Sequence, residues 1–394
     1  MSHVDRPSAV IAASYLAALN ALLVNLQPLI LGAMAEGYGL TDRELGYVSS
    51  VFVGFNTLII ATGPWWVRRI NWRMFTACAV AAASAAVAAG ALVSQLWALL
   101  LIFALVGVTK GLIFVPTFAS LGDATNPDRG YGVSVAFQSL MAAAAAAPLA
   151  AWVMPAYGVQ GLFVTVAAVT ATGLVACGWL PAEGRVDRTA HRGSDRPLWS
   201  LAAVPAVVAL AALMAFGGGV AAFWFFVERI GTARGVSPAF IGLTLSITAL
   251  SGILTSSIVA WIGGRVSSLN IIAVGLATIW AGYGALALAP TPGFVLCNLL
   301  FALGWGLSTP AFWALLRKVD ATGRLFVAAA AASGLAAVLV GAVAGPVIER
   351  GGYTGLTVFS GGLLLVGFAL AVLAQRIAAA VTLHPEQIEA GVAR

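Results

Sequence analysis

The stretch that decides the fold reads GVTKGLIFVPT, residues 107–117, inside an apolar run from about Leu96 to Leu121. At a rise of about 1.5 Å per residue, Lys110 lies roughly 20 Å from either end of a helix built from this run. A lysine side chain cannot reach a membrane surface from that depth. A buried ammonium costs at least about 2.5–3.5 kcal/mol on insertion scales, and it persists where it faces a bundle interior or a water-filled cavity. The stretch therefore predicts a membrane-spanning helix that turns Lys110 toward the inside of a bundle.

The composition of the whole chain agrees with a membrane protein. Hydrophobic residues make up 61% of the 394 residues and charged residues 9%, and the mean hydropathy is +0.99. Apolar segments of about 20 residues cross a bilayer as helices. The first one begins near Ala9 and is too long for the core of a cleavable signal. These features argue against a soluble enzyme and against a nucleic-acid-binding protein.

The three cysteines, Cys78, Cys177 and Cys297, all lie inside apolar runs. Their spacing matches neither a metal motif nor a disulfide framework. We interpret them as small buried hydrophobes. No cofactor, metal site or catalytic residue is expected.

Twelve membrane spans are predicted, and the longest polar break between them, from Pro181 to Pro197, divides the chain six and six. The expected organisation is an N-terminal six-helix bundle at 1–181, a cytoplasmic linker at 182–198, a C-terminal six-helix bundle at 199–380 and a cytoplasmic tail at 381–394. The predicted spans are residues 9–34, 45–67, 74–93, 96–121, 132–154, 159–181, 199–230, 237–262, 269–289, 292–316, 325–349 and 355–378.

The distribution of Lys and Arg predicts the orientation. With both termini in the cytoplasm, 15 of the 20 Lys and Arg residues lie on that side of the membrane and four lie on the other, and Lys110 is the remaining one. Such a bias toward the cytoplasm orients membrane proteins. It also explains the basic pI of 9.6 without a nucleic-acid partner. We expect a multi-pass protein of a bacterial inner membrane.

The two halves of the chain echo each other at matching loops. GPWWVRRINWR at 63–73 follows the second span, and AWIGGR at 260–265 follows the eighth. Asp123 and Arg129 follow the fourth span, and RKVD at 317–320 follows the tenth. Two parallel six-helix repeats would produce such matches.

At these residues the chain resembles the major facilitator superfamily, whose loop between spans 2 and 3 has the form G-x-x-x-D-[RK]-x-G-[RK]-[RK]. Gly63 and Arg68 match that motif, whereas Val67 and Ile70 replace its Asp and its second Gly. The resemblance implies an all-α membrane protein with twelve transmembrane helices in two six-helix bundles. It further implies a secondary transporter that moves a small-molecule substrate across the lipid bilayer by alternating access. We expect the protein to be a monomer.

The resemblance also implies that spans 1, 4, 7 and 10 line a central cavity, and helical spacing then selects the faces turned toward it. One ammonium, several amides and several aromatic rings would meet there. This combination suits an organic anion with an apolar or aromatic body. The candidate substrate-binding residues are Lys110, Asn20, Gln27, Phe114, Trp224, Asn298, Trp305 and Thr309.

Other interpretations stay open. Lys110 could be uncharged, since burial disfavours an ammonium, could be held by carbonyl groups of a neighbouring span, or could itself carry a coupled proton. Small residues around Pro148 resemble an antiporter motif of the family and favour efflux of amphipathic drugs or metabolites instead. A transport-inactive receptor or lipid-handling protein on the same helices is an alternative of another class.

Gating and coupling residues are expected at the ends of the spans. Asp123 is expected to pair with Arg73 or Arg129 when the cytoplasmic mouth closes. Arg68, which matches the motif of the loop between spans 2 and 3, is a further gating candidate. Glu36, Glu228 and Arg229 could form an outer gate. All three histidines lie outside the spans, so coupling to protons would use Glu36, Glu228 or Lys110, and exchange against a counter-anion is the other possibility.

Overall fold

The computed structural model describes residues 3–184, 204–262, 265–320 and 324–383, and within these ranges every regular element is a helix. The predicted linker at 182–198 and the predicted tail at 381–394 lie almost entirely outside the described residues.

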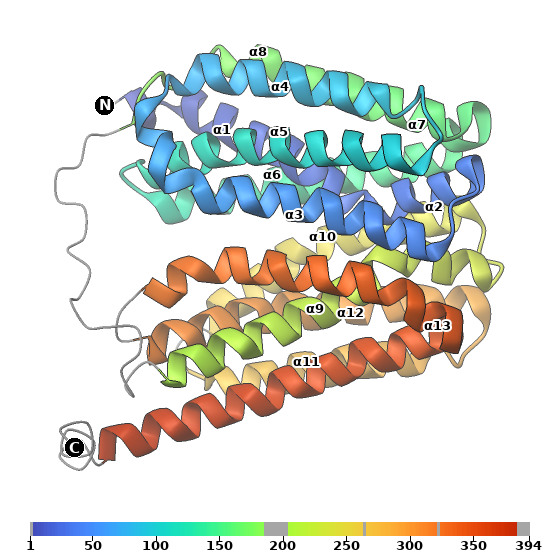
Figure 1. Ribbon diagram of the computed structural model, residues 1–394. Helices are drawn as coiled ribbons and strands as arrows, with labels where there is room; N and C mark the ends of the chain where they lie inside the picture. The colour runs from blue at the N-terminus through green and yellow to red at the C-terminus, as the bar shows by residue number, and fades with distance from the viewer. Residues whose placement is uncertain (1–2, 185–203, 263–264, 321–323, 384–394) are drawn as a thin grey trace.

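The helices form two halves, one above the other in Figure 1. The first half contains η1 (His3–Asp5), α1 (Pro7–Asn25), α2 (Gln27–Tyr38), α3 (Asp42–Trp66), η2 (Val67–Arg69), α4 (Trp72–Ala89), α5 (Leu96–Gly122), α6 (Pro127–Pro148), the π-helical η3 (Leu149–Val153), α7 (Met154–Ala171) and α8 (Gly173–Cys177). The second half contains α9 (Val204–Ala233), α10 (Pro238–Ile262), α11 (Ser268–Ala285), α12 (Pro290–Val319) and α13 (Arg324–Leu383).

These helices account for twelve membrane spans. Nine stretches of the described chain are long and apolar enough to cross a membrane, and two of them, Arg129–Cys177 with 49 residues and Ala331–Ala380 with 50, are long enough to cross it twice. The shorter apolar stretch Pro238–Gly252 in α10 supplies the twelfth. The prediction of twelve transmembrane helices in two six-helix bundles is therefore confirmed.

Each double-length stretch is broken at one glycine, and the two glycines have nearly the same backbone. Gly158 in α7 has φ 60° and ψ −156°, and Gly352 in α13 has φ 60° and ψ −165°. Other residues rarely adopt this region of φ and ψ. Gly158 separates spans 5 and 6, and Gly352 separates spans 11 and 12, so the repeat relation between the halves extends to their sharpest bends.

Local signals explain where the helices at one end of the bundle begin and stop. Gly39, with φ 69°, ends α2 in the left-handed conformation. Thr41 and Glu44 then form a reciprocal capping box that starts α3. We call this the Asp42 end, after the first residue of α3. The opposite end, where α1 begins and Arg68 and Arg69 follow α3, is the arginine-rich end.

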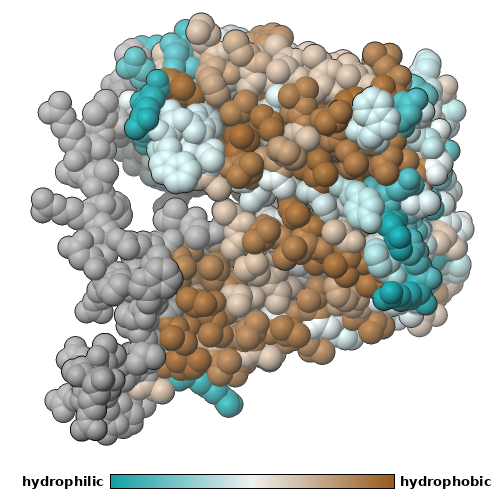
Figure 2. Space-filling model, in the orientation of Figure 1, coloured by the Kyte–Doolittle hydropathy of each residue, from teal (hydrophilic) through white to brown (hydrophobic). Residues whose placement is uncertain are grey.

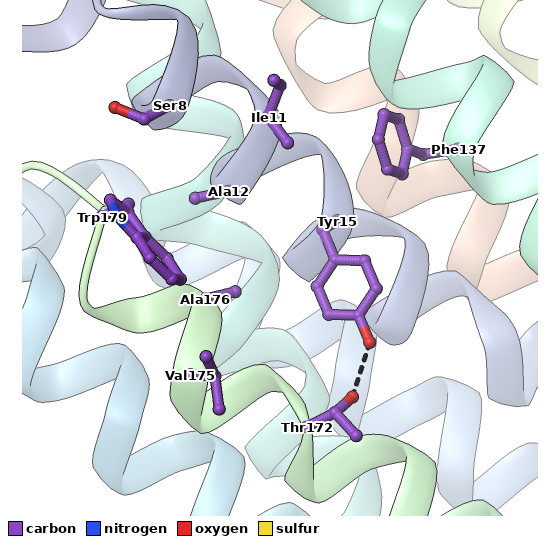
Figure 3. A pocket seen from close by; sticks show the side chains of 9 residues that line it. All are labelled: Ser8, Ile11, Ala12, Tyr15, Phe137, Thr172, Val175, Ala176 and Trp179. Atoms are coloured by element: carbon purple, nitrogen blue, oxygen red, sulfur yellow. Dashed lines mark hydrogen bonds between the residues drawn. The ribbon is translucent and has the colours of Figure 1, made fainter.

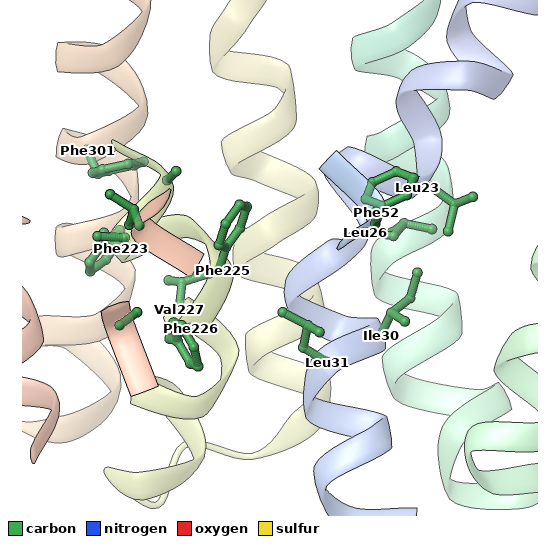
Figure 4. Packing of buried hydrophobic residues seen from close by; sticks show 14 of the residues in the cluster. Leu23, Leu26, Ile30, Leu31, Phe52, Phe223, Phe225, Phe226, Val227 and Phe301 are labelled. Carbon is green, nitrogen blue, oxygen red and sulfur yellow. The ribbon is translucent and has the colours of Figure 1, made fainter. Parts of the chain in front are cut away.

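The halves meet chiefly through α3 with the first part of α13, through α6 and the following η3 with α10, and through α2 with α9. Buried apolar side chains continue across this contact as one cluster. In Figure 4, Leu31 of α2 points toward α9, where Phe225 projects on the side nearer the first half, whereas Phe223 lies against Phe301 of α12. On the outer surface, Figure 2 shows a broad hydrophobic band between hydrophilic residues gathered toward the two ends, as a bilayer-spanning protein requires.

Candidate functional site

Asp42 joins the two halves at one end of the interface between them. Its carboxylate accepts a hydrogen bond from Nε of Arg229 in α9, at 3.4 Å, and another from the hydroxyl of Tyr353 in α13, at 3.0 Å. The next residue, Arg43, forms an ion pair with Glu349 of α13. The start of α3 is thereby tied to two helices of the other half.

Close backbone packing continues this contact toward the middle of the membrane. A side-chain carbon at Gly46 of α3 would overlap the carbonyl of Gly341 in α13, and one at Gly345 would overlap the backbone of Arg43. Ser50 donates a hydrogen bond to the carbonyl of Val338 at 2.7 Å. Small residues allow such close helix contacts in membranes, so the interface is tightly closed at the Asp42 end.

The contact of α6 and η3 with α10 packs in the same manner. A side-chain carbon at Gly242 would overlap Ala150 and would come within 2.9 Å of the carbonyl of Ala146. The hydroxyl of Ser246 accepts a hydrogen bond from the backbone N–H of Ala147 at 2.9 Å. Each half therefore contributes small residues to this contact as well.

A break in the first span creates a further link between the halves. Pro28 has no backbone N–H, so the carbonyl of Val24, four residues earlier, lacks its ordinary helical partner. The helix is interrupted there, with α1 ending at Asn25 and α2 beginning at Gln27. Trp224 of α9 donates its indole N–H to this carbonyl at 3.2 Å. The predicted span over 9–34 is therefore interrupted at Leu26, and a side chain of the other half replaces the missing donor.

At the arginine-rich end, the polar contacts of the described loop between spans 2 and 3 lie within the first half. Arg68 binds Asp123 with two nitrogens, one of them at 2.6 Å. Arg73 donates from Nε to the carbonyl of Leu180 at 2.9 Å, and Arg129 is exposed. In the described conformation Asp123 is paired with Arg68, because the short helix η2 turns that side chain toward the end of α5. The pairing of Asp123 with Arg73 or Arg129 was expected for the state closed at this end, and it stays a prediction. The hydrogen bonds and ion pairs that join the described parts of the two halves lie toward the Asp42 end and the middle.

Lys110 is fully buried, with 0% of its surface exposed. Its ammonium donates a hydrogen bond to the carbonyl of Leu19 in α1 at 2.7 Å. This is the contact with a neighbouring span that the sequence left open as an alternative. Within the described residues, no second acceptor lies within hydrogen-bond distance of the ammonium.

Three buried amides share a feature: each has a side-chain oxygen with no hydrogen-bond donor among the described residues. Asn20 and Gln27 lie on the broken first span, and Asn298 lies on α12. The nitrogen of Asn298 donates to the carbonyl of Phe294 at 2.9 Å. Buried acceptors without a donor are costly, and native proteins have few of them. These oxygens could accept hydrogen bonds from a solute.

Trp305 and Thr309 lie on the face of α12 between its contacts with two other helices. On one side of them Phe312 stacks on Phe216 of α9, with ring centroids 4.6 Å apart. On the other side Gly306 packs against α10. At 3.6 residues per turn, positions 305 and 309 fall between these faces. Trp305 is 44% exposed, so this face has room for another group.

The remaining aromatic candidate, Phe114 of α5, belongs to a stack directed toward the arginine-rich end. Its ring lies 3.9 Å from that of Phe118, which in turn lies 5.7 Å from that of Tyr131 in α6. Phe114 is partly buried by these contacts. It therefore packs against other rings of the first half.

The predicted outer-gate residues have different environments. Glu36 is exposed. Glu228 is buried and packs against Gly32 of α2, so it lies at the interface between the halves. One of its oxygens accepts a hydrogen bond from Thr232 at 2.7 Å, and the other has no donor among the described residues.

Sequence reasoning missed Asp42 and Tyr353, which complete the contact made by Arg229. Asp42 lies in the first turn of a helix behind a capping Thr, and an acid there is ordinarily explained by helix capping. Tyr353 follows the bend at Gly352, which the hydropathy pattern does not mark. The pair of glycines at the bend, Gly351 and Gly352, was the one available signal.

The part of the chain that the structure describes contains no group of three or more His, Cys, Asp or Glu residues that could hold a metal ion. A family model described as the Major Facilitator Superfamily matches residues 13–339. No match was found among curated protein sequences.

Solved structures of the following transporters have a similar fold. The structure of the nucleoside transporter NupG is 14% identical to this chain and has a TM-score of 0.73, with 94% of this chain and 98% of that chain covered. A structure of a point mutant of NupG has a TM-score of 0.74, with 99% of that chain covered. A proton-dependent oligopeptide transporter structure is 14% identical, with coverage of 94% and 98% and a TM-score of 0.72. At such low identity these likenesses establish the fold and not the substrate.

Proposed function

The chain belongs to the Major Facilitator Superfamily of secondary transporters, and we propose that it moves a small organic anion with an apolar or aromatic body across a bacterial inner membrane. The two halves would rock about the central contact, alternately opening the Asp42 end and the arginine-rich end. The described conformation would be the one closed at the Asp42 end.

The observation that carries the substrate proposal is the environment of Lys110. An ammonium has three donors, and here one of them binds the neutral carbonyl of Leu19. Charges buried with one neutral acceptor are poorly compensated, whereas a carboxylate partner supplies both opposite charge and strong hydrogen bonds. A substrate carboxylate would provide that partner once the halves move and open a path to Lys110. Trp305 would offer the apolar part of the substrate a large aromatic surface.

A second candidate substrate is an uncharged solute rich in hydroxyl or N–H groups. The buried oxygens of Asn20, Gln27 and Asn298, which lack donors among the described residues, favour it. A nucleoside is one such solute, and the fold resembles that of a nucleoside transporter. The direction of transport is open in both cases.

For orientation, we propose that the arginine-rich end faces the cytoplasm, as the distribution of Lys and Arg indicates. Both termini would then be cytoplasmic, and the protein would act as a monomer. Glu228 would be the group for coupling to protons, because it is a buried carboxyl at the interface that opens and closes. In an exchange mechanism, transport would be coupled to the return of a second anion and not to a proton on Glu228.

The test is thermal stabilisation of the purified protein by a panel of organic anions, nucleosides, organic cations and neutral amphiphiles. Ligands that bind the folded protein raise the apparent midpoint of unfolding. Lys110→Gln is compared with Lys318→Gln, which changes the other lysine of the chain, at the arginine-rich end of α12. Stabilisation by an anion that is lost only with Lys110→Gln supports the proposal. Equal stabilisation of both variants by nucleosides would favour the second candidate, and equal stabilisation by cations or neutral amphiphiles would favour an efflux protein.

A further inference from the structure

A cavity of about 570 Å³ lies on the first half, between α1, α6 and α8 (Figure 3). Its lining is apolar and aromatic, apart from a few hydroxyl groups. The residues around it are Ser8, Ile11, Ala12, Tyr15, Phe137, Thr172, Val175, Ala176 and Trp179. We call this cavity the α1–α8 groove.

At the end of the groove farthest from Ser8, the polar side chains already have hydrogen-bond partners within the protein. The hydroxyl of Thr172 donates to the carbonyl of Val169 at 2.6 Å. It lies 2.5 Å from the hydroxyl of Tyr15, a contact drawn as a dashed line in Figure 3. Because the Thr172 hydroxyl has one proton, Tyr15 must be the donor in that contact. A ligand in the groove therefore does not need a polar group at this end.

A second cavity, of about 420 Å³, adjoins the groove at the arginine-rich end, and Ser8 and Trp179 line both. Two cationic side chains, Arg6 and Arg73, line this second cavity together with one acidic residue, Glu183. The hydrogen bond from Nε of Arg73 to a backbone carbonyl fixes its guanidinium in place. We call this cavity the basic pocket, since it has an excess of positive charge.

Both cavities are distinct from the contact between the halves. They are lined by residues of the first half only. Three apolar side chains of the groove are largely exposed on the protein surface, with exposed fractions of 52% for Ile11, 66% for Val175 and 55% for Trp179. On a membrane-spanning segment such a surface faces hydrocarbon, so the groove opens toward the bilayer.

We propose that the groove and the basic pocket together bind one anionic glycerophospholipid from the leaflet at the arginine-rich end. An acyl chain would lie in the groove, and the phosphate would lie between Arg6 and Arg73. From Ser8 to Tyr15 the groove follows α1 for roughly 10 Å, about a third of the hydrocarbon thickness of a bilayer. Basic pockets between transmembrane helices at the cytoplasmic side are the expected sites for anionic headgroups. The inference uses the proposed membrane orientation and is independent of the transported substrate.

Retention of lipid by the purified full-length protein, measured by native mass spectrometry, tests the proposal. The probes are phosphatidylglycerol and phosphatidylcholine, both with palmitoyl and oleoyl chains, and inorganic phosphate as a competitor. We expect phosphatidylglycerol to bind more tightly than phosphatidylcholine. In the double variant Arg6→Gln/Arg73→Gln its affinity should fall roughly 30-fold, since each arginine near a membrane surface contributes a factor of roughly five.

The matched control is Arg69→Gln/Arg376→Gln, which removes two exposed arginines of the same end that line neither cavity. It should bind as the wild type does. Val175→Trp, at an exposed position in the groove, should weaken phosphatidylglycerol binding without removing a charge, and excess inorganic phosphate should not displace the lipid. Equal loss in the control variant, equal binding of the two lipids, or displacement by phosphate would each overturn the proposal. Size-exclusion profiles of all variants show whether they fold.

Discussion

The strongest test of the closed Asp42 end is the substitution Asp42→Asn. It keeps the shape of the side chain and the acceptor for the Tyr353 hydroxyl, but it removes the charge that faces Arg229. The side chains of Asp42 and Arg229 are only 19% and 25% exposed, so solvent screens their interaction weakly. Hydrogen bonds to charged groups are worth about 1.5–3 kcal/mol.

The long distance of 3.4 Å between Arg229 Nε and the carboxylate favours the lower limit of that range. We therefore expect a loss of about 1.5 kcal/mol, which raises the ratio of molecules open to closed at this end roughly 12-fold. The pair Arg43–Glu349 is a matched comparison at the same interface, with exposed fractions of 46% and 47%. Exposed pairs contribute about 0–1 kcal/mol, so Arg43→Gln should raise the same ratio by a factor of about five at most.

The assay is electron–electron double resonance between spin labels on the two halves. Labels at Tyr157 and Leu288, which are 72% and 54% exposed, report the separation at the Asp42 end in a background without the three native cysteines. Arg229→Gln should resemble Asp42→Asn, and the double variant should add little, because each single change already breaks the interaction. An unchanged distance distribution in Asp42→Asn, or a larger shift in Arg43→Gln, would refute the reasoning.

Three further substitutions have defined outcomes. Trp224→Phe removes the donor to the Val24 carbonyl and should open the Asp42 end roughly 2- to 12-fold by the same distance measurement, the range expected for one net hydrogen bond; no shift would mean that the contact is incidental. Gly46→Val introduces a side chain where the two halves touch and should abolish closure and transport, measured as a single long distance and no uptake; normal uptake would show that the close packing is not required. Asp123→Asn leaves Arg68 without its bidentate partner and should lower the midpoint of thermal unfolding, whereas an unchanged midpoint with altered transport would assign Asp123 to gating.

The helices were predictable because the bilayer imposes a simple rule. A run of about 20 apolar residues has to form a helix whatever its neighbours are, so hydropathy located all twelve spans. The matching loops also indicated two related halves. The bends at Gly158 and Gly352 repeat that relation in the backbone, although a glycine in an apolar run does not by itself signal a bend.

The contacts of the candidate site were harder to predict because backbone atoms supply many of them. Lys110 binds the carbonyl of Leu19, and Trp224 binds the carbonyl of Val24. Such acceptors are present at every position, so the residue types alone do not select one. Pro28 carried part of the signal, since it identifies the carbonyl that lacks a helical donor.

For a related reason, the sequence could not show which loop arginine pairs with Asp123 in the described conformation. Asp123 has several arginines nearby in the predicted loops, and sequence spacing does not order them by distance. The turn at η2 brings Arg68 into its ion pair with Asp123. Similarly, the sequence placed Glu228 and Arg229 at one gate, but their different environments follow from the helical face each occupies: one packs against α2 and the other reaches α3.

The most direct test of the proposed function is uptake into proteoliposomes containing the purified protein, measured for the organic anions that stabilise it. The account predicts saturable uptake of at least one such anion, lost in Lys110→Gln and retained in Lys318→Gln. Saturable uptake of an anion at equal rates by the wild type and by Lys110→Gln would contradict the role of Lys110, and uptake of neutral or cationic solutes alone would contradict the proposed substrate.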